Sequence, residues 1–323
     1  MKRISQYLGF LIALLIFGVV AFFAFKDVDL GLLMSQVGLT DMACNVLAGI
    51  GFFYSLGFLM KIVYSQHYKF QLTSADTFCL PFMMHLWTYI LPVKGGLIFQ
   101  TFFIKSKYDL DLSKGFSVGV LIFVVSLFVT SILGGLMSMT IENTSILRLV
   151  LLFMFLTLLL FIIAGKLVSR PVEERLGILN RIIAFTKKVL IQFNEQTNDC
   201  TLLSKLTLLT ILSAFVQAGW FYQTASMLGF KPEPVGILLA TLVLRIIVLI
   251  RLLPGNLGIQ EFMTSAVFAS AGLSIQEGLL TAVVIRFSSM LLAATIGAAG
   301  TYINLNSIGM KSFEQLYNVL KLK

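Results

Sequence analysis

The chain has 323 residues, of which 58% are hydrophobic and only 12% charged, and its mean hydropathy is +0.94. A soluble domain carries about twice that charged fraction, so the composition excludes an ordinary soluble enzyme and indicates an all-α polytopic membrane protein. The net charge of +9 is typical of cytoplasmic loops that attract anionic lipid, and no nucleic-acid-binding pattern accompanies it. The cysteines and histidines have no spacing that suits a disulfide framework or a metal ion, and no cofactor motif is present; these residues are Cys44, Cys79, Cys200, His67 and His85.

Hydrophobic runs taken in chain order predict about six full spans. The first run follows Met1-Lys2-Arg3 and is too long for a cleaved signal peptide, so we expect a retained helix with its N-terminus in the cytoplasm. The second run is rich in small residues such as Gly57, which let helices approach closely. Basic residues after the last run place the C-terminus in the cytoplasm as well. The expected spans are residues 8–25, 42–63, 115–140, 146–164, 206–228 and 279–303.

Two further apolar stretches are interrupted and do not fit a simple span. The stretch 73–104 is broken at Pro92, Gly95 and Gly96, and a full crossing there would place four lysines outside, against the charge bias of membrane proteins. We therefore predict a re-entrant hairpin that enters and leaves on the inside. The stretches 235–253 and 260–271 are expected to form a second hairpin from the outside, with a helix break at Pro254, Gly255, Asn256 and Gly258.

The order of spans and hairpins suggests one transmembrane domain, residues 1–323, built from two half-repeats of opposite orientation. The halves are residues 42–140 and 206–303, each a span, a broken hairpin and another span. Inverted repeats with broken helices in corresponding positions are typical of transporters with a site near the membrane midplane. The basic segment 166–205 between them has apolar residues at helical spacing. It is expected to be either an amphipathic helix on the inner membrane surface or a linker helix packed on the protein.

Charged residues in or beside membrane segments are the candidate binding residues. They are Lys94, Arg245, Arg251, Glu261 and Arg286. Arginine binds phosphate through a planar fork of donors, and a half-helix that begins after the glycine break presents free amides to an anion. The basic residues are therefore expected to bind a lipid phosphate. Glu261 is expected to balance the arginines, to bind a substrate amino group or to carry a proton; the alternative is a structural ion pair with Arg286 or Arg245. The prolines and glycines of the two breaks are expected to shape the backbone.

The stretch from Leu253 to Glu261 resembles the Pro-Gly-Gly-Leu-Gly-x-x-Glu signature of the lysylphosphatidylglycerol synthase transmembrane, or flippase-like, family. Residues Leu91-Pro92 to Gly96 resemble that family's earlier Pro-x-x-x-Gly-Glu-x-x-Arg motif, and Arg286 stands where the family tends to carry an arginine. Asn256 replaces a glycine of the signature, and Gln100 stands near the usual arginine of the earlier motif. The resemblance implies movement of a phospholipid or polyprenyl-linked lipid, without the aminoacyl-transferase domain that follows in the best-known members.

The sequence therefore predicts a lipid flippase, and not an enzyme, in a bacterial cytoplasmic membrane. Its expected partners are membrane lipids and a lipid-modifying enzyme. Two alternatives remain open. The first is a polyprenol-dependent membrane glycosyltransferase, because Asp27 and Asp29 resemble the acidic signature of those enzymes. The second is a non-transporting scaffold for a lipid-synthesis enzyme.

Overall fold

The protein, seen as a computed structural model, is helical throughout the residues that the structure describes, which are 15, 17–26, 37–91, 95–139, 152, 154–156, 159, 178–247 and 256–304. The predicted span 146–164 lies mostly outside these residues, and of the predicted span 8–25 they include residue 15 and residues 17–25, which are helical. Of the helices described, α3, α6, α9 and the continuous run formed by α12, a π-helical turn and α13 are long and apolar enough to cross a membrane. The helices are α3 (Leu39–Gln66), α4 (Ser74–Ile90), α5 (Gly95–Tyr108), α6 (Leu112–Ser138), α8 (Ile178–Thr197), α9 (Cys200–Met227), α10 (Pro234–Ile247), α11 (Ile259–Phe268), α12 (Ile275–Leu292) and α13 (Ala298–Asn304).

Side-chain caps decide where two of the long helices begin. Asp199 accepts a hydrogen bond from the Leu202 N–H (2.9 Å) at the start of α9. Ser274 and Glu277 form a capping box at the start of α12, in which each backbone N–H donates to the other side chain (2.7 and 3.2 Å). Because these polar caps precede the apolar runs, both helices begin earlier than hydropathy alone predicts, and α9 begins inside the segment expected to be a linker.

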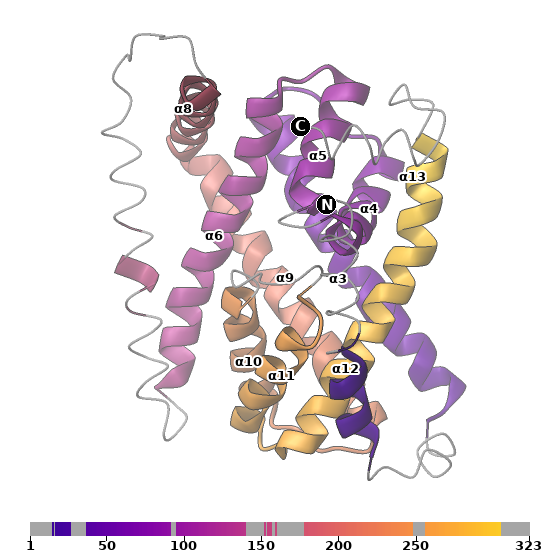
Figure 1. Ribbon diagram of the computed structural model, residues 1–323. Helices are drawn as coiled ribbons and strands as arrows, with labels where there is room; N and C mark the ends of the chain where they lie inside the picture. Colours follow the sequence, from indigo (N-terminus) through magenta and orange to yellow (C-terminus); the bar gives the residue numbers. More distant parts are fainter. Residues whose placement is uncertain are drawn as a thin grey trace.

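The long and short helices occur in the same order twice along the chain. Helix α3, the pair α4 and α5, and α6 form the first set; α9, the pair α10 and α11, and α12–α13 form the second (Figure 1). The α4–α5 pair lies toward one end of the long helices and the α10–α11 pair toward the other (Figure 1). The four short helices have 17 residues or fewer, fewer than the roughly 20 that a crossing needs. Re-entrant insertion and the division into half-repeats stay predictions.

Glycines bring α4 into backbone contact with helices on two sides. A Cβ at Gly57 of α3 would lie 1.9 Å from the carbonyl oxygen of Thr77, and a Cβ at Gly297 in the π-helical turn would lie 2.6 Å from that of Phe82. No side chain fits at either distance, so both glycines are required for this packing. The expected role of small residues in the second span is confirmed at Gly57.

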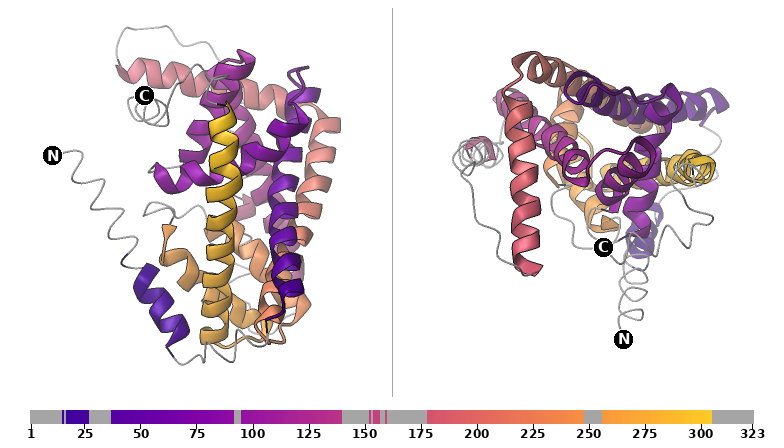
Figure 2. Two further views of the ribbon diagram at one scale, coloured as in Figure 1. Left: turned by 90° about the vertical axis from the view of Figure 1, so that its right-hand side faces the viewer. Right: turned by 90° about the horizontal axis from the view of Figure 1, so that it is seen from above.

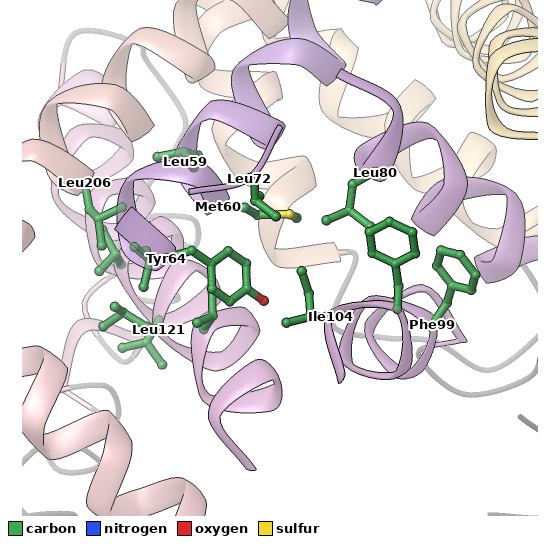
Figure 3. Packing of buried hydrophobic residues seen from close by; sticks show 14 of the residues in the cluster. Leu59, Met60, Tyr64, Leu72, Leu80, Phe99, Ile104, Leu121 and Leu206 are labelled. Atoms are coloured by element: carbon green, nitrogen blue, oxygen red, sulfur yellow. The ribbon is translucent and has the colours of Figure 1, made fainter. Parts of the chain in front are cut away.

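A buried apolar cluster fixes the first hairpin against the long helices. It joins α3, α4, α5, α6 and α9, and Figure 3 shows the side chains converging from these separate helices. Dense packing of this kind leaves little freedom for the hairpin to change its register. The side chains labelled there are Leu59, Met60, Tyr64, Leu72, Leu80, Phe99, Ile104, Leu121 and Leu206.

Helix α8, within the predicted linker 166–205, packs on the protein. It lies across the ends of the long helices (Figure 2) and contacts α6. Phe193 is fully buried in the core, and Gln196 donates hydrogen bonds to the hydroxyl groups of Tyr68 (2.8 Å) and Ser117 (3.0 Å). These contacts show that α8 packs on the protein, and its contact with the inner membrane surface stays a prediction.

Replacing Gly57 with alanine is expected to force α3 and α4 apart. Overpacking of this kind costs about 1–3 kcal/mol, so the melting temperature of the purified protein should fall. The matched control is Gly135→Ala in α6, where an added Cβ meets nothing within 4 Å. Thermal unfolding in detergent compares the two variants, and equal melting temperatures would contradict the packing role of Gly57.

Cysteine labelling tests the two re-entrant hairpins. Ser74 and Ser106 are exposed at the two ends of the α4–α5 pair, Val235 is exposed at the start of α10, and Gln276 is exposed in the first turn of α12, shortly after α11. In a background without the native cysteines, Ser74→Cys and Ser106→Cys should react with an impermeant maleimide from one membrane face only. Val235→Cys and Gln276→Cys should react only from the opposite face. Labelling of Ser74→Cys and Ser106→Cys from different faces would show that the first stretch crosses the membrane.

Candidate functional site

A cavity of about 500 Å³ lies among α3, α4, α5, α6, α9, α10, α11 and α12. Its volume is within the usual range for ligand sites. The wall is mainly apolar, but Arg245, Glu261 and Arg286 all line it, so three of the five charged residues singled out in the sequence meet at one place. The aromatic part of the wall consists of Phe52, Phe53, Phe116, Phe123, Trp220 and Phe221.

The predicted helix break is visible where α11 begins. Asn256 and Gly258 have positive φ angles of 56° and 83°, a conformation that glycine adopts freely and asparagine tolerates. The Gly258 N–H donates to the Glu261 carboxylate (2.5 Å), which satisfies one of the free amides at the helix start. Asn256 is buried without a hydrogen-bond partner for its amide. Asn256 therefore stands in for glycine because it tolerates the positive φ angle, and not because its side chain makes a hydrogen bond.

Glu261 and Arg286 form a buried ion pair between α11 and α12. The Arg286 Nε donates to the carboxylate oxygen that Gly258 leaves unused. The side chains are 2% and 7% exposed, respectively. The Arg286 guanidinium also donates to the Gln260 side-chain oxygen (2.9 Å). Both carboxylate oxygens are thus engaged, one in shaping the break and one in neutralising Arg286.

Tyr89 connects the first hairpin to this ion pair. It stands in the last turn of α4, and its hydroxyl group accepts a hydrogen bond from the Arg286 guanidinium (3.1 Å). The same hydroxyl lies 3.1 Å from His85 Nε2 and 3.4 Å from the Ser289 hydroxyl. Tyr89 also packs on Leu257, the residue between the two left-handed positions. The end of α4 and the start of α11 therefore meet at Arg286.

Arg245 is held by neutral groups. Its Nε donates to the Gln217 side-chain oxygen (3.2 Å), and its two terminal nitrogens donate to the hydroxyl groups of Ser126 (3.2 Å) and Ser213 (3.4 Å). Among the described residues, no carboxylate lies within ion-pair distance of it. Arg245 consequently leaves an uncompensated positive charge at the cavity wall.

Gln100 brings an unused acceptor to the same cavity. It is fully buried in α5, and its amide nitrogen donates to the Tyr64 hydroxyl (3.1 Å). Its side-chain oxygen has no hydrogen-bond partner. Buried acceptors without donors are rare because their desolvation is not repaid. Gln100 is therefore a cavity residue whose bonding is incomplete.

The remaining predicted site residues divide into two groups. Gly95 and Gly96 begin α5, and a Cβ at either would lie within 2.5 Å of backbone or side-chain atoms of α4 or the residue after it, so the two helices approach closely at these glycines. The others fall outside the described residues. These are Lys94, Arg251, Pro92, Pro254 and Gly255, together with Asp27 and Asp29.

Several polar contacts of the site were missed at the sequence level. Gln217 and Ser126 bind Arg245, and Gln260 and Tyr89 bind Arg286. The signal that could have found Gln217 and Ser126 is a polar side chain within a predicted span, and each of these spans holds several. Serine in a membrane helix is common enough that this signal alone does not single out Ser126.

Breaking the Glu261–Arg286 pair from either side is expected to destabilise the protein. Removing one partner of a buried pair costs about 3–5 kcal/mol because the other charge is left uncompensated. Glu261→Gln and Arg286→Gln should each lower the melting temperature, and the double variant should lose less than the sum. The control, Glu195→Gln, changes an exposed carboxylate and should stay within about 0.5 kcal/mol of wild type. Strictly additive losses would show that the pair is not coupled.

A comparison with protein families accounts for most of the chain. Residues 10–297 match the family described as the lysylphosphatidylglycerol synthase TM region. The match includes both hairpins and every residue described above as lining the cavity. A comparison with curated proteins gives no match. The chain belongs to the lysylphosphatidylglycerol synthase transmembrane-region family, and is a multi-pass membrane protein of a family linked to lipid synthesis or translocation.

Proposed function

We propose that the protein is a lipid translocase in the cytoplasmic membrane of a bacterium. It moves an anionic, phosphate-bearing phospholipid or polyprenyl-linked lipid across the bilayer and does no covalent chemistry on it. The observation that carries this proposal is Arg245, a cation at the wall of a largely apolar cavity with only neutral hydrogen-bond partners.

The physical requirement for lipid translocation is shelter for a charged headgroup inside the hydrocarbon core. A phosphate without partners there is very costly. Arg245 offers a planar fork that matches two phosphate oxygens, and the aromatic wall of the cavity suits hydrocarbon. One cavity therefore provides surfaces for both the head and the tail of a lipid.

The two hairpins provide the parts for alternating access. The α4–α5 and α10–α11 pairs lie toward opposite ends of the long helices (Figure 1), and both pairs line the cavity. In transporters of this general architecture, the site lies where broken segments from the two halves meet. Movement of one hairpin relative to the other would expose the cavity to alternate membrane faces.

Glu261 and Arg286 have a different task in this proposal. Their mutual contact neutralises both charges, so they build the meeting point of the hairpins, where Arg286 also binds Gln260 of the cavity wall and Tyr89 of α4. Direct contact of either residue with the lipid headgroup stays a prediction.

Transport in proteoliposomes tests the proposal. Wild-type protein should move tail-labelled phosphatidylglycerol or a tail-labelled polyprenyl phosphate lipid between leaflets, measured by dithionite quenching. Arg245→Gln removes the charge while keeping a hydrogen-bonding side chain. Loss of a charged hydrogen bond should slow transport by about 10- to 100-fold.

The matched control is Lys188→Gln, which removes an exposed positive charge from α8 and should transport at the wild-type rate. Arg245→Gln must unfold at the wild-type temperature for the comparison to count as a site effect. Failure of the wild-type protein to move either lipid class would refute the proposed function.

A further inference from the structure

We propose that the cavity selects a lipid with a monoanionic phosphodiester and an uncharged headgroup that carries a hydroxyl group. This inference rests on the proposed function, because it assigns the cavity to the transported lipid. Two independent observations support it: the charge balance of the cavity wall and the incomplete bonding of Gln100.

The charge balance follows from the pairs that the cavity residues make. Among the described residues that line it, the formally charged ones are Arg245, Glu261 and Arg286, and His85 is a further titratable side chain. Glu261 and Arg286 cancel. The described part of the wall therefore carries one net positive charge, that of Arg245, and a ligand with one negative charge balances it.

Other headgroup charges fit this wall less well. An ammonium group needs a carboxylate or several acceptors once it leaves water. Glu261 is almost fully buried, with one oxygen on the Gly258 N–H and the other on Arg286, so an ammonium group would have to compete with Arg286 for its charge. The positive group of a zwitterionic or cationic headgroup would thus have no negative charge of its own to bind. A dianionic phosphate would carry one more negative charge than Arg245 neutralises.

The arrangement around Arg245 leaves room for a phosphodiester. A guanidinium group has five N–H donors, and Gln217, Ser126 and Ser213 occupy three of them. Two donors remain for the two non-bridging oxygens of a phosphodiester, which is the planar two-point contact that arginine favours.

Gln100 indicates a second property of the headgroup besides its charge, namely a hydrogen-bond donor. Gln100 is among the residues that line the cavity, and its side-chain oxygen is buried and has no donor. That oxygen faces α6 at Gly119, where a Cβ would lie only 3.6 Å away, and Gly119 also lines the cavity. A hydroxyl group of a glycerol or sugar headgroup supplies the missing donor without adding charge. A simple alkyl headgroup leaves the oxygen unsatisfied.

Binding of a lipid panel to purified protein, measured by native mass spectrometry, tests this selectivity without requiring transport. The panel is dioleoylphosphatidylglycerol, dioleoylphosphatidylmethanol, dioleoylphosphatidylethanolamine and a polyprenyl phosphohexose. Wild-type protein should retain phosphatidylglycerol, the polyprenyl phosphohexose or both about tenfold more strongly than phosphatidylethanolamine. The lipids retained most should also bind several-fold more strongly than phosphatidylmethanol, which has the same charge but no hydroxyl group.

Variants separate the two contributions. Arg245→Gln should abolish the preference over phosphatidylethanolamine, while Arg245→Lys, which keeps the charge, should retain it. Gln100→Leu should abolish only the preference for phosphatidylglycerol over phosphatidylmethanol. Lys188→Gln is the matched control and should bind the panel as wild type does.

The outcomes identify the lipid source and distinguish this inference from the proposed function. Stronger retention of phosphatidylglycerol assigns the cavity to a glycerophospholipid, and stronger retention of the phosphohexose assigns it to a polyprenyl lipid. Equal binding of all four lipids by wild-type protein overturns the inference, even if transport is observed. Selective binding without transport upholds the inference about the site and refutes the translocase function.

Discussion

The ion pair between Glu261 and Arg286 is the contact on which the arrangement of the broken segments depends. A charge that is almost fully buried in a membrane protein is very costly without an opposite charge beside it, because neither lipid nor a dry interior can solvate it. Glu261 meets this requirement while also closing the start of α11 through the Gly258 N–H. Arg286 then reaches Tyr89 at the end of α4. One pair thus ties together a helix start, a long helix and the opposite hairpin.

Arg245, the second arginine of the cavity, has neutral hydrogen-bond partners in place of a carboxylate. Arg245 is surrounded by an amide oxygen and two hydroxyl groups, which orient its guanidinium without cancelling its charge. Neutral partners cost less ligand affinity than a carboxylate would, since an incoming phosphate does not have to displace a counter-charge. Arg286 is neutralised by Glu261 and belongs to the part of the site that builds structure. Arg245 is not neutralised and belongs to the part that we propose binds lipid.

Close backbone packing gives this polar centre a rigid frame on one side. Gly57 and Gly297 place α4 directly against α3 and the π-helical turn, so the helix that carries Tyr89 has little freedom to slide. In a membrane, where the hydrophobic effect does not drive helices together, such short backbone distances supply much of the packing energy. The α10–α11 side has a helix break with two left-handed residues near its tip.

The sequence by itself determined the class of protein, the position of the helix break at Asn256 and Gly258, and the suspicion that Arg245, Glu261 and Arg286 matter. These features are local: the length of an apolar run, a breaker within it, a charge where charge is costly. Only the tertiary structure decided that Glu261 pairs with Arg286, that Arg245 keeps its charge, and that Gln100 and Gln217 face the cavity. A polar side chain in an apolar helix gives the same local signal whichever way it points. The rotation and crossing of neighbouring helices, set by packing between residues far apart in the chain, decide what it meets.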